Sequence, residues 1–324
     1  MSRWSVLLLL CCAPAASWAL SSSEQSADDP KAWLEKMVEA TQNLNYVGVF
    51  VYRDGDRMET MRIVHRTDGD GERERLVSLS GSVREVLRDE ERVTCILPDR
   101  QSVVVGKSRS RSLLPMRALR TADGLTRHYM LSVREGGRVA GRDTRLVNIT
   151  PRDEYRYAYR FWVDADNGLL LKSEVHGDAT EPLEEIVYTS IETPQRIADA
   201  MLEPSVSGQG FTWYTTEKAA APQSAGEKRW RITWVPPGFA LRQRDRDPVP
   251  TSSMPVDHRW YTDGVASLSV FIEPLPQDGE PLEGASSMGA VNAFGRVVDG
   301  HQVTVVGEVP ARTVQSVGQS VVPE

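Results

Sequence analysis

The sequence predicts an α+β protein with two domains: a larger curved antiparallel sheet with helices, and a smaller domain of antiparallel strands and one helix. Two observations carry this prediction. Short runs of alternating apolar residues are separated by turns rich in Gly and Asp, which is the pattern of antiparallel strands. A polar, weakly periodic stretch at 197–226 then divides a chain of 324 residues, which is long enough for two cores.

Residues 45–97 show the strand pattern most clearly. Val47, Val49 and Val51 alternate with Phe50 and Tyr52, and Asp-Gly or Ser-Gly turns follow at short intervals. Turns this short join antiparallel neighbours. A chain that meanders in this way forms a curved open sheet. Its concave apolar face must be covered by helices, another domain or an apolar ligand.

The N-terminus has the pattern of a secretory signal peptide over residues 1–19. Arg3 precedes an apolar run, and Ser17-Trp18-Ala19 places small residues at the cleavage positions. Lipidation of a cysteine in this run is less favoured, because no small residue precedes either candidate. After cleavage Cys95 is the one cysteine that remains, so no internal disulfide is expected. We interpret it as a buried apolar side chain on a strand.

Elements of the first domain, 20–196, follow in order. Asp29-Pro30 predicts the start of an amphipathic helix that continues to about residue 43, with an apolar stripe that includes Trp33 and Met37. After the strands of 45–97, further strands are expected at 129–134, 138–150, 155–163, 169–176 and 184–193. Asn167-Gly168 supplies the turn of a hairpin.

A basic segment at 100–127 interrupts these strands. It holds seven basic residues and one acid around Leu113-Leu114-Pro115-Met116. One interpretation is a solvated loop that balances the acidic strands. The other is a site for an anionic amphiphile or an acidic peptide. The chain as a whole is acidic, with 38 basic against 45 acidic residues, which argues against a general nucleic-acid binder.

The second domain, 227–324, follows the predicted linker at 197–226. Asp263-Gly264 and Asp299-Gly300 predict two hairpins, and a short helix is expected over 311–319. Phe271, with Glu273-Pro274 beside it, ends one strand. Aromatic side chains at a strand end with one fixed charge suit recognition of a peptide at a sheet edge. Core aromatics and an edge-protecting proline are an equally good explanation.

The sequence predicts no catalytic site, no metal site and no cofactor. None of the five histidines pairs with another at metal-ligand spacing. We find neither a Gly-x-Ser-x-Gly motif nor a glycine-rich phosphate loop. Carboxylates are plentiful but scattered. A binding protein, and not an enzyme, is therefore the favoured class.

The chain resembles the MucB/RseB family of periplasmic regulators over nearly the whole predicted mature sequence. The resemblance rests on motifs in both halves: Gly48-Val49-Phe50-Val51-Tyr52, Glu74-Arg75-Leu76, Arg84-Glu85-Val86, Pro151-Arg152-Asp153 with Arg156-Tyr157, Trp234-Val235-Pro236-Pro237-Gly238-Phe239, Ser269-Val270-Phe271-Ile272-Glu273-Pro274-Leu275, and Val303-Thr304-Val305-Val306-Gly307-Glu308-Val309-Pro310. It implies a first domain like the half-barrel of the lipoprotein carriers LolA and LolB.

The resemblance also implies a function. Such a protein binds the periplasmic part of a membrane anti-sigma factor of the MucA or RseA type and shields it from the site-1 protease. Lipid or lipopolysaccharide fragments release it during envelope stress. A periplasmic lipid or lipoprotein carrier is the alternative, and a chaperone or adaptor for exported peptides is a third option. Homo-oligomerisation stays open.

Candidate site residues follow from these expectations. For acyl chains we expect a lining of Phe50, Ile63, Leu76, Phe161 and Leu171. For the phosphates we expect Arg109, Arg111 and Arg117. For the anti-sigma segment we expect Phe271, Glu273 and Glu308 beside the interdomain cleft.

Overall fold

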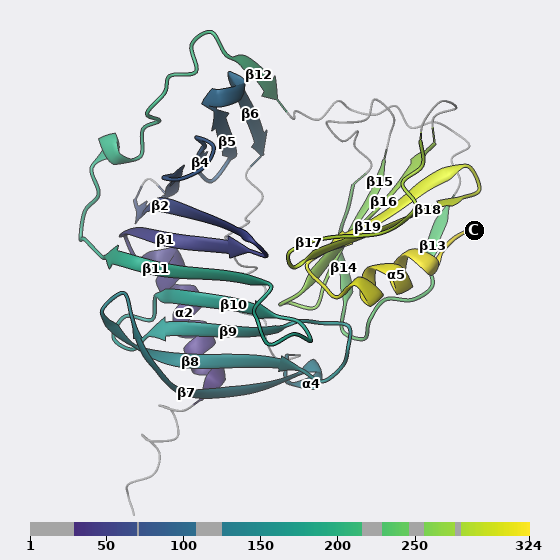
Figure 1. Ribbon diagram of the computed structural model, residues 1–324, viewed down its shortest axis with the longest axis horizontal. Helices are drawn as coiled ribbons and strands as arrows, with labels where there is room; N and C mark the ends of the chain where they lie inside the picture. The colour runs from purple at the N-terminus through teal and green to yellow at the C-terminus, as the bar shows by residue number, and fades with distance from the viewer. Residues whose placement is uncertain (1–28, 70, 108–124, 216–228, 246–255, 276–279) are drawn as a thin grey trace, which may run out of the picture.

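The computed structural model describes residues 29–69, 71–107, 125–215, 229–245, 256–275 and 280–324. Within them, twelve strands form one sheet in the order β12-β6-β5-β4-β3-β2-β1-β11-β10-β9-β8-β7 (Figure 1). The strands are β1 (Tyr46–Asp54), β2 (Arg57–Asp68), β3 (Gly71–Ser78), β4 (Glu85–Arg88), β5 (Arg92–Leu97), β6 (Ser102–Lys107), β7 (Tyr129–Val139), β8 (Arg142–Pro151), β9 (Ala158–Asp164), β10 (Leu170–His176), β11 (Glu184–Glu192) and β12 (Thr212–Thr215). The predicted curved antiparallel sheet is confirmed.

Helix α2 (Pro30–Asn43) lies across one face of this sheet (Figure 1). The Asp29 side chain accepts from the Lys31 amide at 3.0 Å and Pro30 opens the helix, as predicted. The helix buries Leu34 and Met37 against strands β7 to β10. Short helical turns α4 (Leu125–His128), η1 (Pro98–Arg100) and η3 (Asp199–Met201) connect strands.

The face that α2 covers is the concave one. Strand β7 carries a bulge between Glu135 and Gly137, where Gly137 has φ +73°, and a bulge bends a strand. Val139, at the end of β7, therefore reaches back to pack with Phe50 of β1 and Ile63 of β2. The sheet thus curls around its own core.

The second domain is a smaller antiparallel sheet in the order β14-β15-β16-β19-β18-β17. Its strands are β14 (Ala240–Asp245), β15 (Asp257–Thr262), β16 (Ser267–Pro274), β17 (Gly284–Met288), β18 (Val291–Val298) and β19 (His301–Gly307), beside the pair β13 (Trp230–Ile232) and β20 (Val321–Pro323). Helix α5 (Ala311–Gln319) packs Val314 and Val317 on one face. Asp299 and Gly300 have φ of +51° and +76°, which suits the predicted tight hairpin turn.

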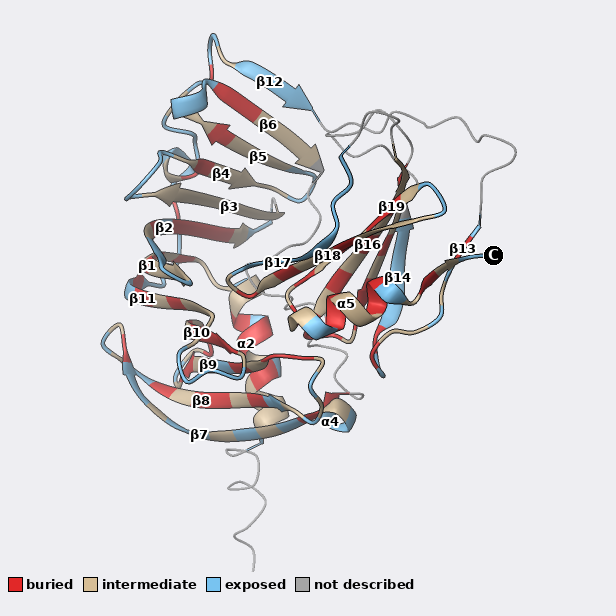
Figure 2. Cartoon of the chain, turned by 45° about the vertical axis from the view of Figure 1, so that its right-hand side comes forward, coloured by how far each residue is buried: buried red, intermediate tan, exposed pale blue. Residues whose placement is uncertain are grey.

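Part of the stretch that the sequence indicated as a linker belongs to the first sheet. η3 lies within it, and β12 pairs in parallel with β6, the one parallel pair among the described strands. Figure 2 shows β12 exposed along its length. Its short polar and aromatic sequence has no alternation of buried residues, which is why the pattern failed to reveal it. None of the described helices is long and apolar enough to cross a membrane.

Candidate functional site

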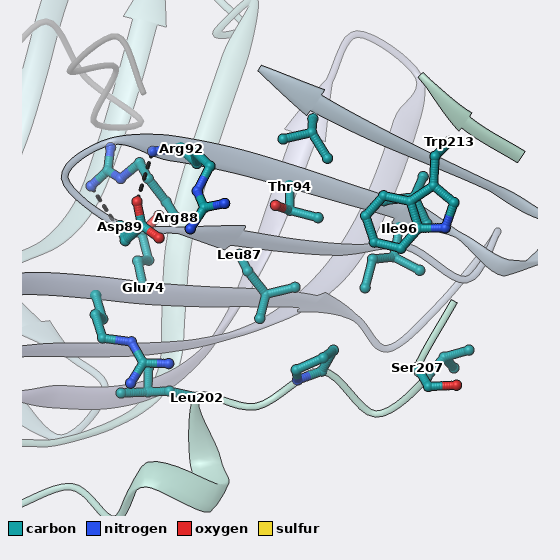
Figure 3. A pocket seen from close by; sticks show the side chains of 15 residues that line it. Glu74, Leu87, Arg88, Asp89, Arg92, Thr94, Ile96, Leu202, Ser207 and Trp213 are labelled. Atoms are coloured by element: carbon teal, nitrogen blue, oxygen red, sulfur yellow. Dashed lines mark hydrogen bonds and ion pairs between the residues drawn. The ribbon is translucent and has the colours of Figure 1, made fainter. Parts of the chain in front are cut away.

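A groove lies on the face of the first sheet opposite α2 (Figure 3). Residues 201–207, here called the crossing segment, run over strands β3 to β6 and leave a cavity of about 340 Å³. Its lining joins apolar side chains to charged and polar ones: Leu87, Ile96, Val103, Val105, Leu202, Pro204, Val206 and Trp213, with Arg73, Glu74, Arg88, Asp89, Arg92, Thr94 and Ser207. Such a lining suits an amphiphile or an extended peptide with a charged end.

A buried carboxylate holds the crossing segment in place. Glu85 is 2% exposed and accepts the Ser205 amide at 3.2 and 3.0 Å. Arg75 donates to Glu85 at 3.1 Å and to the Met201 carbonyl at 3.2 Å. The arginine therefore neutralises the carboxylate and also fixes the start of the segment. At the far end, the Trp213 indole donates to the Gly208 carbonyl at 3.4 Å.

The concave face itself is filled where the predicted acyl-chain lining lies. Phe50, Ile63, Phe161 and Leu171 are at most 2% exposed and form parts of the core. Leu76 packs at the edge of this core and is half-buried. All five predicted residues share one face through the strand register, as the alternation indicated. The alternation could not say how much of that face the protein itself covers.

Beyond Leu76 the same face continues as a partly exposed apolar strip. Cross-strand pairing places Val86 next to Leu76, then Cys95 and Val104 in turn. All four are half-buried. Burial raises the pKa of the Cys95 thiol, which keeps it protonated and apolar. The strip, defined by Leu76, Val86, Cys95 and Val104, is a partly exposed apolar part of the concave face. Arg109, Arg111 and Arg117 lie outside the described residues.

The second sheet also has a face that α5 does not cover. Phe271 stacks on His258 with ring centroids 4.4 Å apart and planes 5° apart. His258 Nε2 lies 3.0 Å from Ser269 Oγ, and Glu273 follows two residues after Phe271 on the same face. Their neighbours Leu268, Val270 and Ile272 point the other way into the core. The predicted pair Phe271 and Glu273 therefore shares an accessible, half-buried surface, which we call the open face.

Glu308 lies apart from this pair. It follows β19 at the domain interface, where the Tyr159 hydroxyl hydrogen-bonds to it. Phe271 pairs with Thr304, several residues back along β19. The sequence order could not show that the first domain would pack against the end of this strand.

Arg156 is the centre of the contact between the domains. It donates from Nε to Asp263 Oδ2 at 2.6 Å, and it also bonds to Asp153 and to the Pro237 carbonyl. Its guanidinium lies 5.7 Å from the Tyr129 ring centroid and 5.0 Å from that of Phe239. The Tyr129 hydroxyl donates to the same Asp263 oxygen at 2.8 Å. One buried cation thus connects five groups from both domains.

Two more contacts fix the domains next to Arg156. Asn292 donates to the Tyr157 hydroxyl and to the Val309 carbonyl, both at 2.8 Å. The Tyr155 ring meets Trp234 edge-on with centroids 5.1 Å apart. Motifs that are far apart in the sequence, around Arg156 and around Trp234, therefore meet at this interface.

A cluster of His65, Glu72 and Glu74 has metal-ligand spacing within the described residues. Arg88 already donates to Glu72 at 2.7 Å and to Glu74 at 3.3 Å. Hydrogen bonding from His65, together with the Arg88 charge, lowers the pKa of Glu72 against the effect of burial. His65 Nδ1 lies 2.9 Å from the Leu44 carbonyl oxygen. Because the carboxylates of the cluster already bond to Arg88, we assign the cluster no metal.

Two family models match this chain. The MucB/RseB N-terminal domain matches residues 29–206, and the MucB/RseB C-terminal domain matches residues 224–322. The chain belongs to the MucB/RseB family. This family consists of regulatory binding proteins and is not an enzyme family.

Characterised members are similar along their whole length. The sigma factor AlgU regulatory protein MucB of Pseudomonas aeruginosa is 34% identical over 331 residues, which cover 100% of this chain and 98% of MucB. The sigma-E factor regulatory protein RseB of Escherichia coli is 25% identical, with 94% of each chain covered. The solved MucA/MucB complex of Pseudomonas aeruginosa matches with a TM-score of 0.70 and 32% identity, covering 91% of this chain and 99% of the matched chain.

Proposed function

We propose that this protein is a periplasmic regulator that binds the periplasmic part of a membrane anti-sigma factor and shields it from the first proteolytic cut. The observation that carries the proposal is the likeness to MucB solved with the periplasmic part of MucA, at a TM-score of 0.69 over 91% of this chain. The signal-peptide pattern of residues 1–19 supports export. A bound segment whose backbone is covered cannot enter a protease site.

The open face of the second domain is the surface we assign to the anti-sigma segment. Phe271 presents a flat ring that its stack with His258 holds in place, and aromatic anchors of this kind contribute a large share of binding energy. Glu273 adds a negative charge two residues away. A segment with an apolar side chain and a nearby Lys or Arg would pack the apolar side chain on Phe271 and pair its charge with Glu273.

Release by lipid is the second part of the proposal. Acyl chains would lie along the strip of Leu76, Val86, Cys95 and Val104, while Arg109, Arg111 and Arg117 would meet the phosphates. Each buried methylene contributes about 0.8 kcal/mol, whereas an exposed ion pair contributes about 0–1 kcal/mol. The acyl chain would therefore supply most of the binding free energy, and the three arginines would select the headgroup. Lipid need only favour a domain arrangement that binds the segment poorly.

The test is calorimetry of the mature protein with the soluble periplasmic segment of the anti-sigma factor, repeated with a lipid A analogue. Saturable binding that the lipid abolishes is the expected result. Lipid uptake without any binding of the segment would replace the proposal with the carrier function.

Phe271→Ala is expected to weaken binding of the anti-sigma segment about tenfold, because loss of a central aromatic contact costs upward of about 1 kcal/mol. Met130→Ala is the matched control, since Met130 is 49% exposed on β7 of the first domain. The readout is the dissociation constant from the same calorimetry. If Phe271→Ala bound the anti-sigma segment as tightly as Met130→Ala does, the segment would not bind at the open face.

A further inference from the structure

Three carboxylates from the two domains gather at their interface, away from Arg156. Asp54 at the end of β1 and Glu184 at the start of β11 are directly opposite each other in the strand pairing. Glu308, from the turn between β19 and α5, is close enough to Glu184 to raise its pKa. Like charges directly opposite on a sheet are destabilising, so this arrangement needs an explanation.

The second domain presses on these carboxylates directly. Gly289, in the turn between β17 and β18, packs so closely on Asp54 that an added Cβ would overlap Asp54 Oδ1. That oxygen is buried and has no hydrogen-bond partner. The next residue, Ala290, is 1% exposed and packs in the core of the first domain. The turn therefore shields these half-buried carboxylates from part of the solvent only while the domains are together.

The groups around this cluster are almost all acidic or neutral. Tyr52 hydrogen-bonds to Glu184, and Tyr159 hydrogen-bonds to Glu308. The other titratable or charged groups that face it are Glu59 beside Tyr52, Tyr157 and Asp178 beside Glu308, and the exposed Arg57 opposite Asp54 in the β1–β2 hairpin. Two hydroxyl donors do not neutralise a cluster of three carboxyl groups.

We propose that Asp54, Glu184 and Glu308 form a proton-operated latch between the domains. When the cluster holds protons, a carboxyl group can donate to its neighbour and the interface stays closed. When the protons leave, like charges buried between the domains repel each other and water enters. This inference concerns the domain arrangement, so it does not depend on the identity of the partner or the lipid.

The directions of the pKa shifts support an interface that is closed at low pH and opens as the pH rises. Burial, followed by the charges of Glu308 and Asp54, raises the pKa of Glu184 from 4.5 to about 7 despite the bond from Tyr52. Burial raises the pKa of Glu308 from 4.5 to about 7 against the bond from Tyr159. A closed protein therefore holds protons that a separated one would release at the same pH. Stabilisation of the closed form is complete below pH 4.5 and is lost as the pH rises through about 7.

The experiment follows the domain arrangement by energy transfer between two dyes. The mature chain carries Cys95→Ser, with Asp143→Cys in the first domain and Gln319→Cys in the second, both at exposed positions. We expect the transfer efficiency to change between about pH 4.5 and about pH 8, because the pKa values of Glu184 and Glu308 rise from 4.5 to about 7 when the domains close. Far-ultraviolet circular dichroism at each pH shows that both domains stay folded.

Substitutions in the latch test whether ionisation of its carboxyl groups causes the change in transfer efficiency. Glu308→Gln, and independently Glu184→Gln, should shrink the pH-dependent change in transfer efficiency and shift its midpoint, because each removes one of the three carboxyl groups that repel one another when ionised. Glu192→Gln, an exposed change on the same strand β11, should retain the wild-type midpoint. A transfer efficiency that does not change with pH while Asp54, Glu184 and Glu308 are all present would overturn the proposal. So would a midpoint that is the same in Glu308→Gln and in Glu184→Gln as in the wild type.

Discussion

Arg156→Ala is expected to lower the free energy of unfolding by about 3–5 kcal/mol. The change leaves Asp263 buried without its cation, and breaking a buried ion pair from one side costs this much. The Arg156 side chain is 0% exposed and that of Asp263 is 1% exposed, so water cannot replace the lost bonds. Thermal and urea unfolding of the mature protein measure the loss.

Arg138→Ala is the matched control for Arg156→Ala. Arg138 lies 3.9 Å from Asp143, and the two side chains are 71% and 85% exposed. Exposed ion pairs contribute about 0–1 kcal/mol, so this variant should unfold almost like the wild type. If both arginine variants lost the same small amount, Arg156 would not be the centre of the domain contact.

Glu85→Ala is expected to cost about 3 kcal/mol and to release the crossing segment from the first sheet. The substitution leaves the Arg75 guanidinium partly buried without its carboxylate, and it leaves the Ser205 amide without an acceptor. Limited proteolysis should therefore cut residues 201–207 faster, well below the unfolding temperature.

Glu59→Ala provides the comparison on the same sheet. Glu59 pairs with Arg84 at 2.8 Å, and the two side chains are 36% and 41% exposed. Its loss should leave both the stability and the proteolysis of residues 201–207 nearly unchanged. Equal cleavage in the Glu59 and Glu85 variants would show that the buried carboxylate does not hold the segment.

Local patterns in the sequence predicted the elements that local physics determines. The proline and aspartate at the start of α2, the apolar stripe of that helix, and the Asp299-Gly300 turn each act within a few residues of themselves. Strand alternation also placed Phe50 and Ile63 on one face correctly.

Long-range contacts explain what the sequence did not reveal. The crossing segment is held by Glu85, 120 positions before Ser205, and no pattern marks that pairing in advance. At Asn167-Gly168, by contrast, the contact that the sequence did not reveal is local. Only Gly168 there has positive φ, at +83°, while the Asp164 side chain accepts the amides of Asp166 and Asn167. The buried carboxylates at the domain interface likewise depend on how two folded domains meet.

The position of β12 has a consequence for how copies of this protein could exchange parts. The chain leaves the first sheet at β12, on one edge, whereas Arg156 and Tyr129 hold the second domain near the opposite edge, which β7 forms. The last strand of the first sheet and the contact between the domains therefore lie at opposite edges of that sheet. A molecule whose interface has opened could dock its second domain onto the first domain of a neighbour, with the same bonds re-formed between chains. Variants that loosen the Arg156 contact should consequently yield domain-swapped dimers at high protein concentration.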